Sequence, residues 1–89
     1  MNFLHYEVEL GSKDSVKVIL TGNAANVLLL DESNFRNYQS GQQYQYFGGH
    51  YTRSPAILRP PNAGHWHVVV NLGGGAGSVN AVVQVVSRR

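Results

Sequence analysis

The stretch that decides the fold is Pro60-Pro61-Asn62-Ala63-Gly64-His65-Trp66-His67-Val68-Val69-Val70-Asn71-Leu72. Its first half is rich in turn-forming residues, and its second half alternates as a half-buried strand does. One face of this strand carries apolar side chains: Trp66, Val68, Val70 and Leu72. The opposite face carries polar ones: His65, His67 and Asn71. We therefore expect the largest core side chain and the closest His pair to share one central strand.

Length and composition indicate a single domain over residues 1–89. A chain of this size buries roughly 60 to 65% of its extended surface, which is enough for a modest core. The absence of cysteine excludes disulfides and thiolate chemistry. The net charge of +2 comes from dispersed Lys and Arg, so a nucleic-acid partner is disfavoured. We find no export signal and no membrane span, and expect a soluble, cytoplasmic protein.

Several further segments have the length and alternation of strands. Together with the central one, the expected strands are residues 3–10, 16–21, 27–30, 56–59, 65–72 and 79–86. Residues 42–51 are broken by Gly48-Gly49, and we expect an irregular strand pair or an edge hairpin there. Residues 73–78 are predicted to be a flexible glycine-rich hairpin between two strands; a phosphate loop is disfavoured because no helix follows.

The one helical signal lies at residues 31–38, where Asp31 or Ser33 can accept from backbone amides at a helix start. Ser40-Gly41 would stop such a helix within two turns. About seven short strands with Gly and Pro between them predict an all-β fold. We expect a compact β-sandwich or a partly open barrel, with at most one or two helical turns.

Several motifs in order resemble one bacterial family, the domain of unknown function numbered eighteen eighty-three. The motifs are Gly22-Asn23-Ala24-Ala25-Asn26-Val27, residues 31–38, Gly48-Gly49, Thr52-Arg53-Ser54-Pro55 and Gly64-His65-Trp66-His67-Val68. The resemblance implies a small, mostly β domain that occurs alone or ahead of a TIR (Toll/interleukin-1 receptor) domain, with no established activity. Because the sequence ends soon after its last expected strand, we expect the domain without such a partner here.

The residue types of the least regular stretch, with the His pair, suggest a binding surface. Tyr rings can stack on a ligand, and amides and Arg can read its polar edges. The candidate ligand-binding residues are Asn34, Arg36, Tyr38, Tyr44, Tyr46, Tyr51, Arg53, His65 and His67. The alternative is that the rings close one end of a small sandwich and the glutamines nearby are merely solvated.

His65 and His67 would lie roughly 7 Å apart on one strand face, a spacing that can chelate a metal ion when other ligands converge. The candidates for those other ligands are His5, Glu7, His50 and Asp31. If the strand carrying His5, Glu7 and Glu9 pairs with the His strand, a mixed site suited to zinc, manganese or iron results. Because the sequence alone does not place three converging ligands, we expect no bound metal and no cofactor. The alternative to metal binding is that the two His side chains are simply solvated or hydrogen-bonded.

The sequence therefore predicts a small non-enzymatic binding or sensing module with a small-molecule or protein ligand. One alternative is a cupin-like, metal-dependent enzyme that uses His65 and His67. Another is an assembly domain, such as a homo-oligomer that pairs through an edge strand. No catalytic residue is expected, because no nucleophile stands beside a base.

Overall fold

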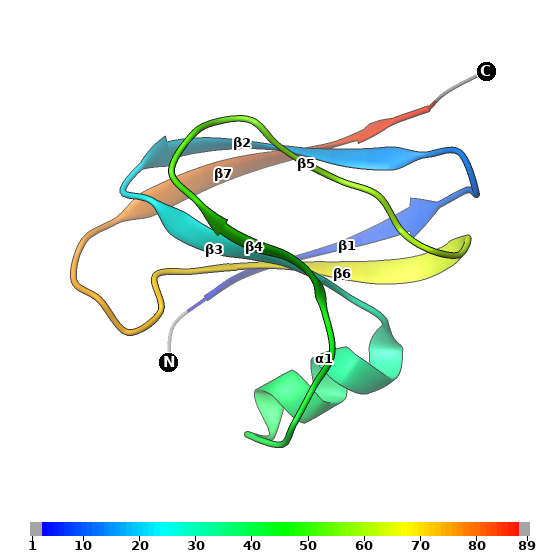
Figure 1. Cartoon of the computed structure of the whole chain (residues 1–89), viewed down its shortest axis with the longest axis horizontal. Helices are drawn as coiled ribbons and strands as arrows, with labels where there is room; N and C mark the ends of the chain where they lie inside the picture. Colours follow the sequence, from blue (N-terminus) through cyan, green and yellow to red (C-terminus); the bar gives the residue numbers. More distant parts are fainter. Residues whose placement is uncertain (1–2, 88–89) are drawn as a thin grey trace.

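Strand β6 (Gly64–Asn71) is an interior strand of a four-stranded antiparallel sheet, as its alternation predicts. The order of this first sheet is β1 (Leu4–Leu10), β6, β3 (Ala25–Leu30) and β4 (Phe47–Tyr51). The order of the second sheet is β5 (Ala56–Leu58), β2 (Ser15–Gly22) and β7 (Val79–Val86). The computed structural model describes residues 3–87, and Figure 1 shows the two sheets as stacked layers.

The inner faces of the two sheets form the main core. Trp66 is 5% exposed there, and Val68 and Val70 of the same strand are fully buried. The indole Nε1–H of Trp66 donates to the carbonyl of Asn62 at 3.0 Å, so the polar edge of the ring is satisfied. The expected β-sandwich is therefore confirmed, because within residues 3–87 seven strands form two separate sheets and no closed barrel.

The glycine-rich segment is not the expected hairpin. Residues 73–78 connect β6 to β7, but these strands belong to different sheets. The reason is that β1 and β3 occupy both edges of β6, whereas β7 pairs with β2 from Ser15↔Val86 to Gly22↔Val79. The segment is therefore a crossing from one layer to the other.

The expected helical turns form helix α1 (Glu32–Gln39), which ends before Ser40. Its N-cap is Asp31, whose carboxylate accepts from the backbone N–H of Asn34 at 2.9 Å. Figure 1 shows α1 below the outer face of the first sheet. A second apolar cluster lies between them: Leu28, Leu30, Phe35 and Val69. Both faces of β3 and β6 are thus covered along part of their length.

Residues 42–51 contain one edge strand rather than a hairpin of their own. Residues 42–46 have no regular structure, and β4 pairs with β3 alone. Gly48 allows this pairing, because its φ is 131° and a Cβ there would meet the carbonyl oxygen of Val27 at 2.1 Å. β4 is thereby held against β3 at the edge of the sheet.

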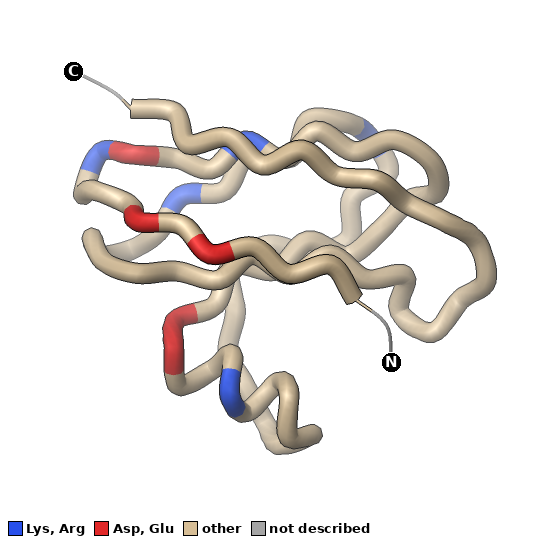
Figure 2. Tube along the Cα trace, turned by 180° about the vertical axis from the view of Figure 1, so that it is seen from behind, with Lys and Arg blue, Asp and Glu red and all other residues tan. Residues whose placement is uncertain are grey.

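Acidic and basic residues are distributed differently over the molecule. Figure 2 shows Lys and Arg dispersed over several elements, whereas acidic residues of β1 and of the start of α1 lie toward one end of the molecule. No helix within residues 3–87 is long and apolar enough to cross a membrane. The acidic end is the end at which the His pair of β6 lies, because β1 pairs with β6 there.

Candidate functional site

The pairing of β1 with β6 meets the condition stated for a mixed His and carboxylate site. In the observed register Glu7 lies opposite His67 and Glu9 lies opposite His65. These side chains occupy the outer face of the first sheet. With two further residues they form what we call the His/Glu cluster: His5, Glu7, Glu9, His65, His67 and Glu32.

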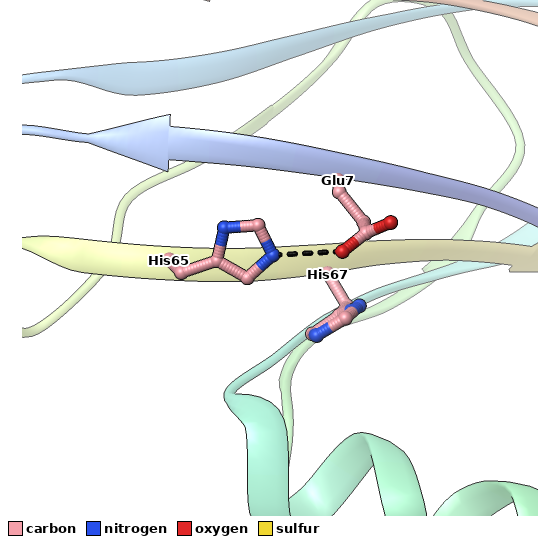
Figure 3. Close-up of side chains that lie close together, drawn as sticks. All are labelled: Glu7, His65 and His67. Carbon is pink, nitrogen blue, oxygen red and sulfur yellow. Dashed lines mark hydrogen bonds and ion pairs between the residues drawn. The ribbon is translucent and has the colours of Figure 1, made fainter.

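His65 is held between two carboxylates. Its Nε2 lies 2.9 Å from Oε1 of Glu7, and its Nδ1 contacts Oε1 of Glu9 (Figure 3 shows the Glu7 contact). The hydrogen bonds with Glu9 and then Glu7 raise the pKa of His65, and the bond from His65 is the main cause of the lowered pKa of Glu7. All three side chains are well exposed, with 40% for His65 and 56% for Glu7. They can therefore rearrange around a ligand at little structural cost.

His67 differs from His65 because it is buried, with only 3% of its side chain exposed. Its Nε2 lies 2.8 Å from Oε1 of Glu32 in the first turn of α1, and its Nδ1 lies 2.8 Å from Nε2 of His5. A carboxylate only accepts, so Nε2–H of neutral His67 donates to Glu32 and Nδ1 then accepts from His5. The hydrogen bond from His67 is the main cause of the lowered pKa of Glu32.

Phe35 of α1 fixes the positions of the two imidazoles. Its ring stacks on His67 with centroids 4.3 Å apart and on His5 with centroids 4.2 Å apart. Burial is the main cause of the lowered pKa of His5, followed by the neighbouring His67. The lowered pKa favours the neutral form of His5, which is the form that can bind a metal ion.

Three members of the cluster converge as metal ligands do. One ligand atom from each of Glu7, His65 and His67 lies within 4.8 Å of the other two. Figure 3 shows the three side chains, from β1 and β6, gathered above the start of α1. Bonds of about 2.0–2.1 Å in a tetrahedron place ligand atoms about 3.3 Å apart. Nε2 of His65 and Oε1 of Glu7 are already 2.9 Å apart, so a metal ion requires only that this pair move relative to His67. The exposed Glu7 and His65 can make that movement toward the fixed His67.

Two of the predicted extra ligands lie elsewhere. Asp31 caps α1, and its carboxylate is engaged by Asn34 and Ser33. His50 lies on β4, where its Nδ1 contacts Oδ1 of Asn26 at 3.1 Å. His5, by contrast, contacts His67 and belongs to the His/Glu cluster.

The predicted Tyr residues belong mostly to a different place on the same sheet face. A cavity of about 330 Å³, which we call the tyrosine pocket, is lined by Asn26, Tyr38, Tyr44, Tyr46, His50 and Asn71, among others. None of the residues that line it belongs to the His/Glu cluster. The predicted binding surface is therefore divided into two sites.

The remaining predicted residues lie outside both sites. Tyr51 packs against the core between the sheets, and Arg53 is exposed in the connection from β4 to β5. Arg36 is exposed and forms an ion pair with Glu32 at 3.1 Å. Asn34 accepts from the backbone N–H of Gln45 at 2.8 Å, so it tethers the irregular segment to α1.

Four residues of these sites were not predicted from the sequence: Glu32, Phe35, Asn26 and Asn71. Glu32 and Phe35 reach the cluster only because α1 lies across β6. A usable signal was the apolar run around Val69, which placed a Val on the face expected to be wet. That pattern indicates a strand covered on both faces.

Comparison with known proteins identifies the family of this chain. A family model described as a domain of unknown function (DUF1883) matches residues 1–89, so the chain belongs to this family, as its motifs predict. No curated protein and no solved structure matches the chain. The family description assigns no activity, and the function is therefore argued from the geometry of the sites.

Proposed function

We propose that this DUF1883 domain is a small metal-binding module that holds a divalent transition metal ion with Glu7, His65 and His67. The observation that carries the proposal is the convergence of one ligand atom from each of these residues within 4.8 Å. Two imidazoles and a carboxylate suit zinc, and also manganese or iron. They suit magnesium and calcium less well, because these ions prefer oxygen ligands alone. A bound ion would take the place of the proton that His65 and Glu7 share.

The surroundings of His67 support the proposal. Metal-bound His commonly donates its second ring N–H to a carboxylate, which fixes the tautomer and raises the basicity of the ligand nitrogen. Glu32 is placed to accept that hydrogen bond from Nε2 of His67 at 2.8 Å. Nδ1 of His67, which accepts from Nε2 of His5 at 2.8 Å, would then bind the metal ion once His5 releases this hydrogen bond.

The position of the cluster favours binding or sensing over catalysis. His67 contacts Glu32 at the start of α1, whereas the tyrosine pocket includes Tyr38 near its end. Six helical residues separate these points by about 9 Å along the axis. A single-ring molecule in the pocket would therefore not contact a metal ion at the cluster, which favours two separate binding sites over one reaction centre.

The proposal is tested by calorimetric titration of the untagged protein with Zn²⁺. We expect about one equivalent to bind with a Kd of about 10 µM or tighter. Glu7→Gln should weaken binding at least tenfold. Asp14→Asn is the matched control, because it removes one carboxylate charge in the turn that follows β1 and should leave binding unchanged. Absence of Zn²⁺ binding, or equal binding by parent and Glu7→Gln, would refute the proposal.

Assembly is a second candidate, favoured by one observation. β7 lies at the edge of the second sheet, carries no charged residue, and exposes Val82, Val85 and Val86 by 40% or more. Native edge strands of this length are commonly protected by charge or by proline. Sedimentation of the protein over a wide concentration range tests this candidate, and a constant monomer mass would exclude it.

A further inference from the structure

The tyrosine pocket is preorganised by a chain of side-chain hydrogen bonds that crosses four elements. His50 of β4 contacts Asn26 of β3, Asn26 contacts Asn71 of β6, and Asn71 contacts Tyr38 of α1. The separations are 3.1, 2.9 and 2.9 Å respectively. Asn71 is 6% exposed and Leu28, another lining residue, is 4% exposed, so the inner part of the pocket is packed and rigid.

The backbone amide of Gly73 fixes which group donates in each of these hydrogen bonds. The N–H of Gly73 can only donate, and it meets the side chain of Asn71 at 2.9 Å, so that atom is Oδ1. Asn26 must then donate its Nδ2 to the same oxygen and present Oδ1 to His50. Nδ1 of His50 therefore carries the proton, and Nε2 of neutral His50 is left as an acceptor.

The remaining wall of the pocket is aromatic. Tyr44 and Tyr46 line it beside Tyr38, and Tyr46 is 47% exposed. The rings of Tyr38 and Tyr44 are perpendicular, at 85°, and those of Tyr44 and Tyr46 are tilted by 45°. No two of these rings form a parallel slot, so the pocket offers single ring faces and hydroxyl groups rather than a sandwich for a flat base.

The lining has no charged side chain, since Lys, Arg, Asp and Glu are all missing from it. A phosphate or carboxylate would lose its hydration here with no counter-charge in return, so a neutral ligand is favoured. About 330 Å³ is near the lower end for ligand pockets and suits a single ring.

We infer that the tyrosine pocket is a binding site for a neutral sugar ring, alone or at the end of a longer glycan. A sugar ring would lay its C–H face on a Tyr ring and donate a hydroxyl hydrogen to Nε2 of His50. The Tyr hydroxyls would exchange hydrogen bonds with its other hydroxyls. The site shares no residue with the proposed metal ligands, so either proposal stands if the other fails.

The inference is tested with the full chain by following amide shifts in nitrogen–proton NMR spectra. The probes are glucose, galactose, mannose and N-acetylglucosamine, each added to about 10 mM, where a ligand with a Kd near 1 mM is nearly saturating. We expect at least one sugar to shift the amides of Gly49, His50 and Gly73. Adenosine and uridine are tested beside the sugars, because each carries a neutral, flat base attached to a ribose.

Two variants locate the binding. Tyr46→Ala and His50→Ala should each weaken sugar binding by about tenfold, since each removes one contact of about 1.4 kcal/mol. Phe47→Ala is the matched control, because Phe47 is 46% exposed next in the chain and does not line the pocket. It should bind as the parent does. Failure of all four sugars to shift these amides, or shifts by a nucleoside alone, would overturn the inference, as would equal binding by Tyr46→Ala.

Discussion

His67 and Glu32 are 35 residues apart in the sequence, yet Nε2 of His67 lies 2.8 Å from Oε1 of Glu32. The bond joins the central strand β6 to the first turn of α1. His67 is 3% exposed and Glu32 is 52% exposed. His67 therefore needs this hydrogen bond more than Glu32 does, because the exposed carboxylate can bond to water instead. His67 is therefore both a proposed metal ligand and part of the packing under α1.

Replacement of the two His residues should have unequal effects on stability. His67→Ala opens space under Phe35 and removes the partner of His5 and Glu32, so we expect a loss of about 2–3 kcal/mol. His65→Ala removes only exposed contacts and should cost much less. Thermal unfolding measures both, since 1 kcal/mol shifts the midpoint of a domain of this size by roughly 4–8 °C. Equal midpoints for the two variants would show that His67 does not contribute more to stability than His65.

Trp66→Ala should be more damaging than either His variant. Trp66 is 5% exposed between the two sheets and donates to the carbonyl of Asn62. Its removal leaves a large cavity and removes this hydrogen bond, and we expect a loss of about 3–5 kcal/mol. Urea unfolding of the variant beside the parent tests this, and a midpoint within error of the parent would show that Trp66 is not a core residue.

Asp31 should give the start of α1 a dependence on pH. Its pKa is lowered below the ordinary 3.8, first by the hydrogen bond from the backbone N–H of Asn34. A carboxyl with a lowered folded-state pKa stabilises the fold above its unfolded pKa, and the stabilisation is lost as the pH falls through the folded value. Asp31→Ala should cost about 1 kcal/mol at neutral pH.

Asp31→Asn keeps a side chain that can cap the helix but does not titrate. It therefore separates the contribution of the charge of Asp31 from that of the capping hydrogen bond. The parent should exceed Asp31→Asn in stability at pH 7, and this difference should shrink below about pH 4. Denaturant unfolding at both pH values provides the measurement. A difference that stays constant with pH would show that the charge of Asp31 does not contribute.

The alternation of β6 was sufficient to predict which face holds the core, because Trp66, Val68 and Val70 can share only one face of a strand. It was not sufficient to predict that the other face is partly covered. Burial of His67 and Val69 depends on where α1 packs, and an eight-residue helix carries little information about its docking position. The pairing of β7 with β2 rather than β6 was also missed, because nearness in sequence favours hairpins and the alternation does not identify a partner.

The sequence predicted which residues belong to the His/Glu cluster better than it predicted how they come together. His5, Glu7, His65 and His67 were recognised from their spacing along two strands, and the register of β1 with β6 brings them together. The tyrosine pocket could not be predicted as a separate site. It depends on the bond between Asn26 and Asn71, which join strands whose adjacency no local pattern reveals.

The most direct test of metal binding is to observe the His rings themselves during titration with Zn²⁺, using nitrogen–proton NMR of the imidazoles in the untagged protein. Up to one equivalent, the ring nitrogens of His65 and His67 should shift together, and those of His50 should stay in place because His50 lies at the tyrosine pocket. Unchanged signals of His65 and His67 with excess Zn²⁺, or shifts of His50 alone, would contradict the account.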